Sequence, residues 1–465
     1  MQTDELKDLT VSKVSELFRQ KKLSPVEYTK FILKEINDNR DLNAIVSVDE
    51  ELALQNAKES EERYMKDNIL SQIDGVVLGI KDIINTKDVI TTYGCEAYSN
   101  YFPDEDAFVV KKLKYAGVDT SIKCNTSQFA LGPTGEVSYK GAVKNARNPL
   151  YTTGGSSSGS ASAVAAHILP GALGSDSGGS VRVPSSICGT VGIKPTFSLV
   201  SNEGVMPVSE TVDCVGSITR TVEDGARILQ VIAGNNPADW RSAPDVPYDY
   251  LSRLNESVKG DKAVVLDNLF EGTVHETVAA GCRNAVDVLK KCGMEIIHKD
   301  MPQVLDLRKA HQIHMLAMAH AYHLDDIAQN KEYIYEEVMK RLNSGTISSD
   351  EYVHYELKKN NMRKIVLDLL GDAECILYPT TPLTACKIGE GYKMVNVGNT
   401  QTCSYLSNGA LTWASSFAGV PCINIPVGFN KEGLPIGISI MGHPFDEANL
   451  IRIANNLSLE LGLDL

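Results

Sequence analysis

The sequence of 465 residues lacks any long uninterrupted run of apolar residues. Its longest stretch of small apolar residues, 161–173, contains His167 and Pro170 and is too short to span a bilayer. The first five residues are acidic and show neither the basic nor the apolar region of a secretory leader. We therefore expect neither a membrane span nor a signal peptide, and we predict a cytoplasmic protein.

Closely paired cysteines are absent as well. The chain has ten cysteines, but no two of them are separated by two residues and their spacing is irregular. Zinc sites and the disulfide frameworks of small secreted domains need close, regular spacing. We therefore predict reduced cysteines that serve as small apolar side chains in a reducing compartment.

Basic residues are fewer than acidic residues. There are 45 Lys and Arg against 59 Asp and Glu, which gives a formal net charge of −14. An acidic surface disfavours non-specific binding to nucleic acid or to anionic lipid. The hydrophobic content of 43% and charged content of 22% are those of an ordinary soluble globule. Neither nucleic acid nor a membrane is expected as a partner.

Strand-like and helical segments alternate along the chain. The length by itself does not separate two domains from one large α/β domain. Strands are predicted at 42–48, 76–80, 120–123, 172–176, 262–266, 294–297, 375–379, 421–428 and 434–441, and helices at 9–36 (a pair), 50–67, 108–116, 161–167, 275–291 and 446–460. This alternation predicts an α/β protein with one large central sheet. Residues 305–370 are predicted to be a charged, mostly helical insert.

Two Gly/Ser-rich stretches, 154–160 and 178–184, carry Ser156 and Ser180, and Lys81 closes an apolar strand far upstream. A serine hydroxyl is a poor nucleophile until a base takes its proton and N–H groups hold the resulting oxyanion. Closely spaced glycines let several backbone N–H groups converge on one point. A lysine serves as the base only where it is kept neutral. These residues are therefore of the types that an activated serine nucleophile requires.

The Gly-x-Ser-x-Gly pattern at 155–159, centred on Ser157, is the motif of a different kind of serine hydrolase. That motif follows a strand, whereas residues 148–153 are loop-like. We interpret it as a chance match to a short pattern.

Four histidines lie close together at 311, 314, 320 and 323. Spacings of three residues would allow some of them to share a helical face and bind a metal ion. The segment contains no His-Glu-x-x-His and no evident third ligand, so we favour a helix at the edge of a pocket.

The combination resembles the amidase signature family. Residues 176–182 match its Asp-x-Gly-Gly-Ser-x-Arg segment, 154–157 its Gly-Gly-Ser-Ser, and 79–82 its catalytic-lysine motif. The similarity continues through 188–196, 377–382 and 418–421, but it is poor over 305–370. It implies a single domain over residues 1–465 with a mixed central β-sheet flanked by helices, in which 305–370 is a variable helical insert that forms part of the substrate pocket.

The resemblance also implies a mechanism. Ser180 maps to the nucleophile, Ser156 to a bridging serine that follows a cis peptide bond, and Lys81 to the base. The oxyanion would be bound by the backbone N–H groups of Ser177, Gly178, Gly179 and Ser180. We hypothesise that Lys81 is buried and neutral and that the reaction passes through an acyl-enzyme. No metal or organic cofactor is expected, and Arg182 is expected to fix the loop.

The substrate implied is a small amide, and the reaction is hydrolysis of its C–N bond. Esters and carbamates (urethanes) are chemically accessible through the same acyl-enzyme. Aryl or alkyl amides are favoured by aromatic and apolar residues of the predicted pocket, namely Phe129, Leu131, Tyr322 and Trp413, with Tyr405 as a further candidate. A small molecule is the expected partner, and a homodimer is left open.

One alternative belongs to another functional class, the glutaminase (A) subunit of a tRNA-dependent amidotransferase. That subunit carries an Asp that holds the amino group of glutamine, and alignment on 418–421 puts Gly409 at its position. Residues 126–130 also replace its usual Met-Asp-Glu-Phe-Ala, and no counterpart of its Arg-Tyr-Gly segment is evident at 310–330. We favour a stand-alone hydrolase.

Overall fold

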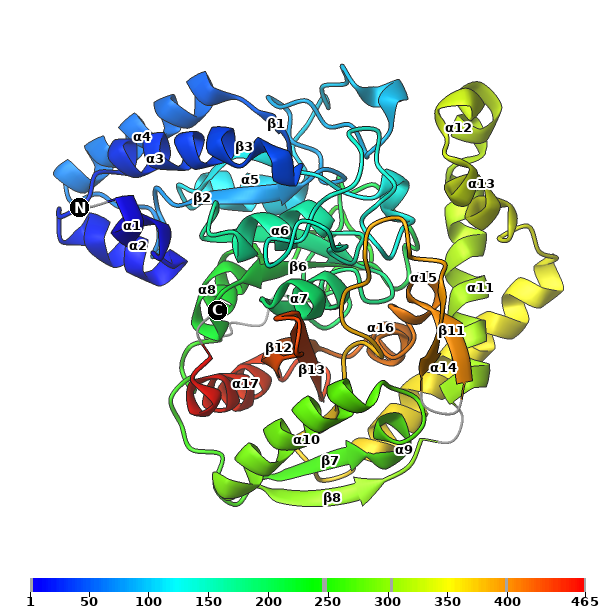
Figure 1. Ribbon diagram of the computed structural model, residues 1–465. Helices are drawn as coiled ribbons and strands as arrows, with labels where there is room; N and C mark the ends of the chain where they lie inside the picture. The colour runs from blue at the N-terminus through cyan, green and yellow to red at the C-terminus, as the bar shows by residue number, and fades with distance from the viewer. Residues whose placement is uncertain (1–2, 245–248, 302–303, 398–399, 464–465) are drawn as a thin grey trace.

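A computed structural model describes residues 3–244, 249–301, 304–397 and 400–463. Within these residues the backbone forms an 11-stranded sheet in the order β1-β3-β2-β4-β6-β5-β12-β13-β9-β7-β8 (Figure 1). Its strands are β1 (Ile45–Val48), β2 (Val77–Lys81), β3 (Asp119–Cys124), β4 (Gly171–Asp176), β5 (Val191–Lys194), β6 (Cys214–Thr219), β7 (Lys262–Leu266), β8 (Glu295–Lys299), β9 (Cys375–Pro379), β12 (Cys422–Phe429) and β13 (Pro435–Gly442). A separate hairpin pairs β10 (Met394–Val397) with β11 (Thr400–Cys403).

Helices cover the sheet along its length. They are α1 (Thr3–Lys7), α2 (Val11–Arg19), α3 (Pro25–Asp38), α4 (Glu50–Met65), α5 (Phe108–Tyr115), α6 (Ser158–Ala165), α7 (Arg182–Cys188), α8 (Val222–Ile232), α9 (Asp267–Phe270), α10 (Glu276–Lys291), α11 (Val304–Tyr322), α12 (Leu324–Gln329), α13 (Glu336–Asn343), α14 (Ser349–Leu370), α15 (Ser404–Ser407), α16 (Trp413–Ala418) and α17 (Glu447–Leu461). None of the described helices is both long enough and apolar enough to cross a membrane.

The sheet is mixed. Strand β2 runs parallel to both β3 and β4, and β7 runs parallel to β8 and β9. Between these two parallel groups, β6, β5, β12 and β13 pair antiparallel with their neighbours. The predicted single α/β domain with a mixed central sheet is confirmed. The predicted strand pair near the C-terminus is the β12–β13 hairpin.

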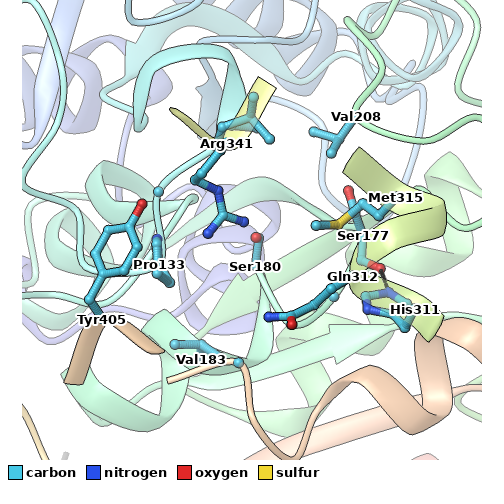
Figure 2. Close-up of a pocket in the computed structure, with 17 residues that line it drawn as sticks. Pro133, Ser177, Ser180, Val183, Val208, His311, Gln312, Met315, Arg341 and Tyr405 are labelled. Atoms are coloured by element: carbon cyan, nitrogen blue, oxygen red, sulfur yellow. Dashed lines mark hydrogen bonds between the residues drawn. The ribbon is translucent and has the colours of Figure 1, made fainter. Parts of the chain in front are cut away.

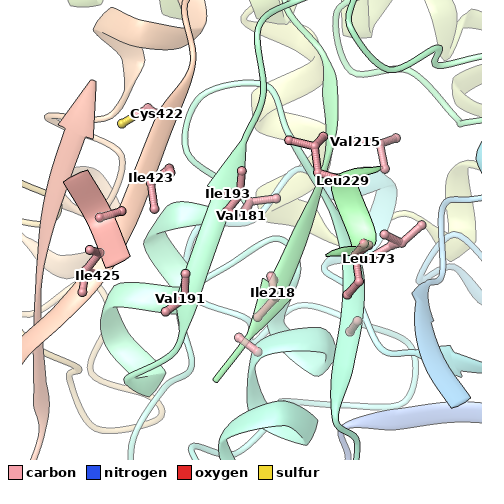
Figure 3. Close-up of a cluster of buried hydrophobic side chains, with 14 of the residues drawn as sticks. Leu173, Val181, Val191, Ile193, Val215, Ile218, Leu229, Cys422, Ile423 and Ile425 are labelled. Atoms are coloured by element: carbon pink, nitrogen blue, oxygen red, sulfur yellow. The ribbon is translucent and has the colours of Figure 1, made fainter. Parts of the chain in front are cut away.

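The core lies on both faces of the central strands, which explains why their sequences are apolar without alternation. Figure 3 shows side chains of β4, β5, β6 and β12 packed side by side, among them Leu173, Ile193, Ile218 and Ile423. Each of these four side chains is no more than 1% exposed. Strands β5 and β6 were not predicted, because their short Gly-containing runs carry little periodic signal. Helix α8 was not predicted either, although its apolar residues follow a helical spacing.

The predicted insert at 305–370 contains α11, α12, α13 and α14, which stand together at one side of the molecule (Figure 1). Helix α11 packs against α13, α14 and α16. His311 of α11 is bonded to Ser177 in the loop after β4, so the insert and the carboxyl end of this central strand face a common space.

Candidate active site

Lys81, Ser156 and Ser175 meet at the carboxyl end of two neighbouring parallel strands. Lys81 is the last residue of β2, and Ser175 lies near the end of β4. The Lys81 Nζ is hydrogen-bonded to Ser156 Oγ at 2.8 Å and to Ser175 Oγ at 2.8 Å. Strand pairing therefore brings together a lysine and a serine that are far apart in the sequence, and β4 supplies a second hydroxyl that the sequence analysis did not single out.

Burial decides the charge of Lys81. Loss of water around the fully buried side chain lowers the pKa of Lys81 to about 7, although Asp176 and Asp213 act in the opposite direction. Burial therefore favours the neutral amine over the ammonium form, and only a neutral amine has a lone pair to accept a proton. Burial likewise raises the pKa of Asp213 to about 6, against hydrogen bonds from Ser177 and from the Ser209 and Val208 amides.

Ser156 is enclosed by the Gly/Ser loop before α6. The Gly155–Ser156 peptide bond is cis. The Ser156 carbonyl accepts hydrogen bonds from Thr126 Oγ1 at 3.0 Å and from the Ser127 N–H at 3.3 Å. A Cβ atom on Gly155 would lie 2.3 Å from the Gly132 carbonyl oxygen, so this position accepts only glycine. These contacts hold the Ser156 hydroxyl beside Lys81.

The loop that carries Ser180 is organised around the buried carboxylate of Asp176. That carboxylate accepts hydrogen bonds from the Gly179 N–H at 2.7 Å, the Val181 N–H at 3.2 Å, and Arg182 Nε and Nη2 at 2.9 and 2.8 Å. Burial alone would raise the pKa of Asp176, but the Arg182 guanidinium outweighs it and holds that pKa well below its usual range. The Ser157 N–H donates to the Ser180 carbonyl at 3.2 Å, which brings the two Gly/Ser loops side by side.

Arg182 joins this loop to α16. Its guanidinium is fully buried and also donates to the Thr412 carbonyl at 2.9 Å, Ser415 Oγ at 2.6 Å and Ser416 Oγ at 2.8 Å. All of these partners are protein atoms outside the cavity described below. The geometry accordingly assigns Arg182 to support of the loop.

The predicted oxyanion donors lie in different surroundings. Ser177, Gly178 and Gly179 all line the cavity in front of Ser180. The Gly179 N–H, however, donates to Asp176 within the loop, and Gly179 has a φ of +130°, which favours glycine. The amides of Ser177, Gly178 and Ser180 therefore remain as the stronger candidates.

A cavity opens in front of Ser180 (Figure 2). Its lining comes from residues 130–133, the two Gly/Ser loops, helix α11 and the segments around Arg341 and Tyr405. Leu131, predicted to bind substrate, is part of this lining, as is Tyr405.

The other three residues predicted to bind substrate do not line this cavity. Phe129 is fully buried and stacks on His323, with 4.2 Å between the ring centroids. Tyr322 is 53% exposed and lines a separate hollow with Met318 and Tyr352. Trp413 is 2% exposed, at the start of α16. Two of these aromatic side chains are packed into the core and the third faces a different surface, so aromatic composition alone did not locate the pocket.

Arg341 is a lining residue that the sequence analysis did not identify. It lies on α13, and its guanidinium points toward Ser180 in Figure 2. Its Nε is buried without a hydrogen-bond partner, and the guanidinium lies 5.9 Å from the centre of the Tyr405 ring. Arg341 is the one lysine, arginine or acidic side chain among the described lining residues. The sequence signal was weak, because Lys340 and Arg341 together look like an ordinary exposed pair.

The four histidines have separate partners. His311 is bonded to the Ser177 carbonyl at 3.0 Å, His314 to Glu356 at 2.5 Å and His323 to Asp326 at 2.7 Å. His320 faces Thr346. Within the described ranges, no three His, Cys, Asp or Glu side chains gather as metal ligands. His311 is the histidine at the pocket, because it lines the cavity beside Ser177.

The family model named amidase matches residues 27–451. The chain belongs to the amidase family. It is therefore a hydrolase that acts on carbon–nitrogen amide bonds, in agreement with the prediction. A curated relative, the A subunit of the glutamyl-tRNA(Gln) amidotransferase of Caldanaerobacter subterraneus subsp. tengcongensis, is 35% identical, and the alignment covers 97% of this chain and 96% of that protein.

Solved structures of similar fold include amidases. The peptide amidase of Stenotrophomonas maltophilia is 25% identical with a TM-score of 0.84, and the alignment covers 97% of this chain and 96% of that chain. A chain from a vestigial protein complex connected with the origins of an s-triazine catabolic enzyme is 26% identical with a TM-score of 0.91, over 97% of this chain and 98% of that chain. This amidase-family chain is thus similar over nearly its whole length both to amidases and to one component of an amidotransferase.

Proposed function

We propose that this amidase hydrolyses small amides that carry a carboxylate group, through Ser180 as nucleophile, Ser156 as proton carrier and Lys81 as base. The observation that carries the substrate class is the Arg341 guanidinium, which faces the cavity with a buried, unpartnered Nε. The arrangement of Lys81 and Ser156 at 2.8 Å supports the proton relay.

The first half of the reaction forms an acyl-enzyme. Ser180 Oγ attacks the amide carbonyl carbon as its proton passes to Ser156, and the Ser156 proton passes to neutral Lys81. The carbonyl oxygen becomes an oxyanion, which backbone N–H groups of the Ser177–Ser180 loop stabilise. The C–N bond then breaks, and the proton held by Lys81 returns through Ser156 to the leaving nitrogen, which departs as ammonia or an amine.

The second half repeats the relay with water. A water molecule gives its proton to the same serine–lysine pair and attacks the ester carbonyl of the acyl-enzyme. The bond to Ser180 Oγ breaks, Ser180 regains a proton, and a carboxylic acid leaves. Carbamates and esters would follow the same route, because attack by Ser180 requires only an accessible carbonyl. Burial of eight of the ten free cysteines supports action in the reducing cytoplasm.

The charge of the cavity favours a substrate with one carboxylate and no ammonium group. A guanidinium recognises a carboxylate by two parallel hydrogen bonds. An ammonium group would need an acidic partner, and no Asp or Glu is among the described lining residues. Gly409, which aligns with the Asp that holds the amino group of glutamine in the amidotransferase subunit, is itself part of this lining. Glutaramate, which is glutamine without its amino group, has the preferred charge, whereas pentanamide lacks the carboxylate.

The second candidate function is the glutamine-hydrolysing component of an amidotransferase. It is favoured by the 32–35% identity to the A subunits of glutamyl-tRNA(Gln) amidotransferases over 96–97% of the chain. In that case the chain would use glutamine, and a partner protein would receive the ammonia. The same serine–lysine relay would serve both functions, so the two differ in substrate and in assembly.

Three matched amides separate these functions. Glutaramate, glutamine and pentanamide have the same primary amide and differ only in the carboxylate and the amino group. We expect the purified chain to hydrolyse glutaramate with a higher kcat/KM than either of the other two. Higher activity on glutamine, or activity that appears only with co-purifying proteins, would establish the second candidate. Highest activity on pentanamide would show that Arg341 does not bind a substrate carboxylate.

A further inference from the structure

We propose that His311 is a positioning residue that orients the Gly178 N–H toward the substrate carbonyl oxygen. This inference rests on the proposed function and adds a residue of the helical insert to the catalytic apparatus. His311 does not touch the reacting atoms in this proposal. It acts through the Ser177–Gly178 peptide unit, which it holds by the Ser177 carbonyl (Figure 2).

The hydrogen bond to the Ser177 carbonyl determines which nitrogen of the His311 ring carries the proton. His311 is 2% exposed, and its Nε2 lies 3.0 Å from the Ser177 carbonyl oxygen. Because a carbonyl oxygen only accepts, Nε2 carries the proton and donates it. Burial lowers the pKa of His311 to about 4, so the ring is a neutral donor throughout the neutral pH range.

The geometry of a peptide bond transmits this hold to Gly178. In a trans peptide unit the C=O and the following N–H lie in one plane and point in opposite directions. Fixing the Ser177 oxygen on the His311 side therefore fixes the Gly178 N–H on the opposite side. The cis peptide bond recorded in the described residues is Gly155–Ser156, so the Ser177–Gly178 unit is trans.

Close packing leaves the peptide little freedom to rotate. A Cβ atom on Gly178 would lie 2.7 Å from His311 Cε1, so the ring rests directly against the glycine backbone. The next carbonyl, that of Gly178, is held by the Thr412 hydroxyl at 2.5 Å. Two consecutive carbonyls of the loop are thus anchored from the α11 side and the α16 side.

An oriented N–H that costs no reorganisation during the reaction is what stabilises an oxyanion. Donation from His311 also polarises the Ser177–Gly178 peptide and makes its N–H a stronger donor. The expected consequence is selective: loss of the His311 donor weakens binding of the tetrahedral state more than binding of the amide substrate.

The experiment compares His311→Leu with His314→Leu. His314 is the matched control, because it is a buried histidine one turn further along α11 that bonds to Glu356 and not to the loop. The readouts are kcat and KM for glutaramate, the inhibition constant of 4-boronobutanoate, and the thermal unfolding midpoint. The boronate forms a tetrahedral adduct with an active-site serine and places an oxygen where the oxyanion would lie.

We expect His311→Leu to lower kcat roughly 10- to 100-fold, somewhat less than the loss caused by removing an oxyanion donor itself. Affinity for the boronate should fall by a similar factor, whereas KM should change little. His314→Leu should leave kcat and boronate affinity near wild type, even where it lowers the unfolding midpoint. Equal kcat and boronate affinity in the two variants would overturn the proposal.

A second pair of variants covers the case in which His311→Leu does not fold. His311→Gln keeps an N–H donor at nearly the same reach, and His311→Asn keeps the polarity at a shorter reach. Boronate affinity should be higher in the Gln variant than in the Asn variant, and equal affinity contradicts the proposal. If wild type hydrolyses glutaramate but the His311 variants match wild type, only the role of His311 fails. If wild type neither hydrolyses glutaramate nor binds the boronate, the proposed function fails as well.

Discussion

Asp176 and Glu336 each pair with a cation, but in opposite surroundings. The Asp176–Arg182 pair has no exposed side-chain surface, whereas Glu336 and Lys340 on α13 are 79% and 70% exposed. Inside the loop after β4, the Asp176 carboxylate is surrounded by protein donors, while Ser177 to Ser180 line the cavity. Over its described side chains, 307–370, the insert 305–370 instead has both buried and exposed faces and presents Arg341 to the cavity.

This difference separates the two tasks of the site. Lys81 at the end of β2 is bonded to Ser156, and the loop of Ser156 is bonded through the Ser157 N–H to the Ser180 carbonyl, an arrangement that suits chemistry common to a family. The insert supplies the groups that would meet the variable part of a substrate. Changes in the two Gly/Ser loops should therefore abolish the reaction or destabilise the protein, whereas changes at Arg341 of the insert should alter selectivity while the protein stays folded.

The largest effect is expected at the relay. Ser180→Ala and Lys81→Ala should each lower kcat for glutaramate by roughly 10⁴-fold or more, because nucleophile and base act as a unit. Stopped and continuous assays of ammonia release measure the loss, and Ser252→Ala on an exposed loop is the control. Activity of Ser180→Ala equal to wild type would exclude Ser180 as the nucleophile.

The two ion pairs test the comparison by stability. Asp176→Asn leaves the buried Arg182 charge uncompensated and should lower the free energy of unfolding by about 3–5 kcal/mol. Glu336→Gln breaks an exposed pair and should give no measurable change. Chemical denaturation of both variants gives the two values. Equal stability losses would show that the loop and the insert do not differ in the way described.

A selectivity effect is expected at Arg341. Arg341→Gln should lower kcat/KM for glutaramate about 10- to 100-fold, since a hydrogen bond to a charged group contributes about 1.5–3 kcal/mol. The same change should leave kcat/KM for pentanamide almost unaltered. Lys340→Gln, which removes the neighbouring exposed cation, is the control. An equal loss of kcat/KM on both amides would mean that Arg341 supports the fold and does not bind the substrate carboxylate.

The smallest effect is a shift in pH dependence. Lys81 accepts a proton only when neutral, so kcat/KM should fall as the pH drops below about 7. Negative charge on Asp213 favours the charged amine and raises the pKa of Lys81. Asp213→Asn removes that charge, so the acidic limb of the profile should move to lower pH. A shift to higher pH, or none, would contradict the assigned electrostatics.

The residues of the proposed relay could be named from the sequence because each lies in a distinctive local pattern that also carries the resemblance to the amidase signature family. Lys81 closes an apolar run that is typical of a central buried strand, and Ser156 and Ser180 lie in glycine-rich loops. Ser175, bonded to Lys81, was not predictable in the same way. Its role depends on the parallel pairing of β2 with β4, which no local pattern specifies.

The pocket was far less predictable. The predicted aromatic residues Phe129 and Trp413 are packed into the core. From the sequence alone, an aromatic residue of the core cannot be distinguished from one that lines a pocket. Arg341 and His311 come from the insert, where side-chain direction is set by how α11 and α13 pack on the rest of the protein. The histidine spacing suggested a shared face, but each ring has its own partner in the folded chain.

Direct titration of Lys81 tests the central claim, that a neutral buried amine is the base. Protein labelled with ¹³C at the lysine ε-carbon would be followed by NMR as the pH is raised, and the Lys81 signal would be assigned by its absence in Lys81→Met. We predict that this signal titrates with a pKa of about 7. A Lys81 signal that stays in the charged form up to pH values near the ordinary lysine pKa of about 10.4 would contradict the account.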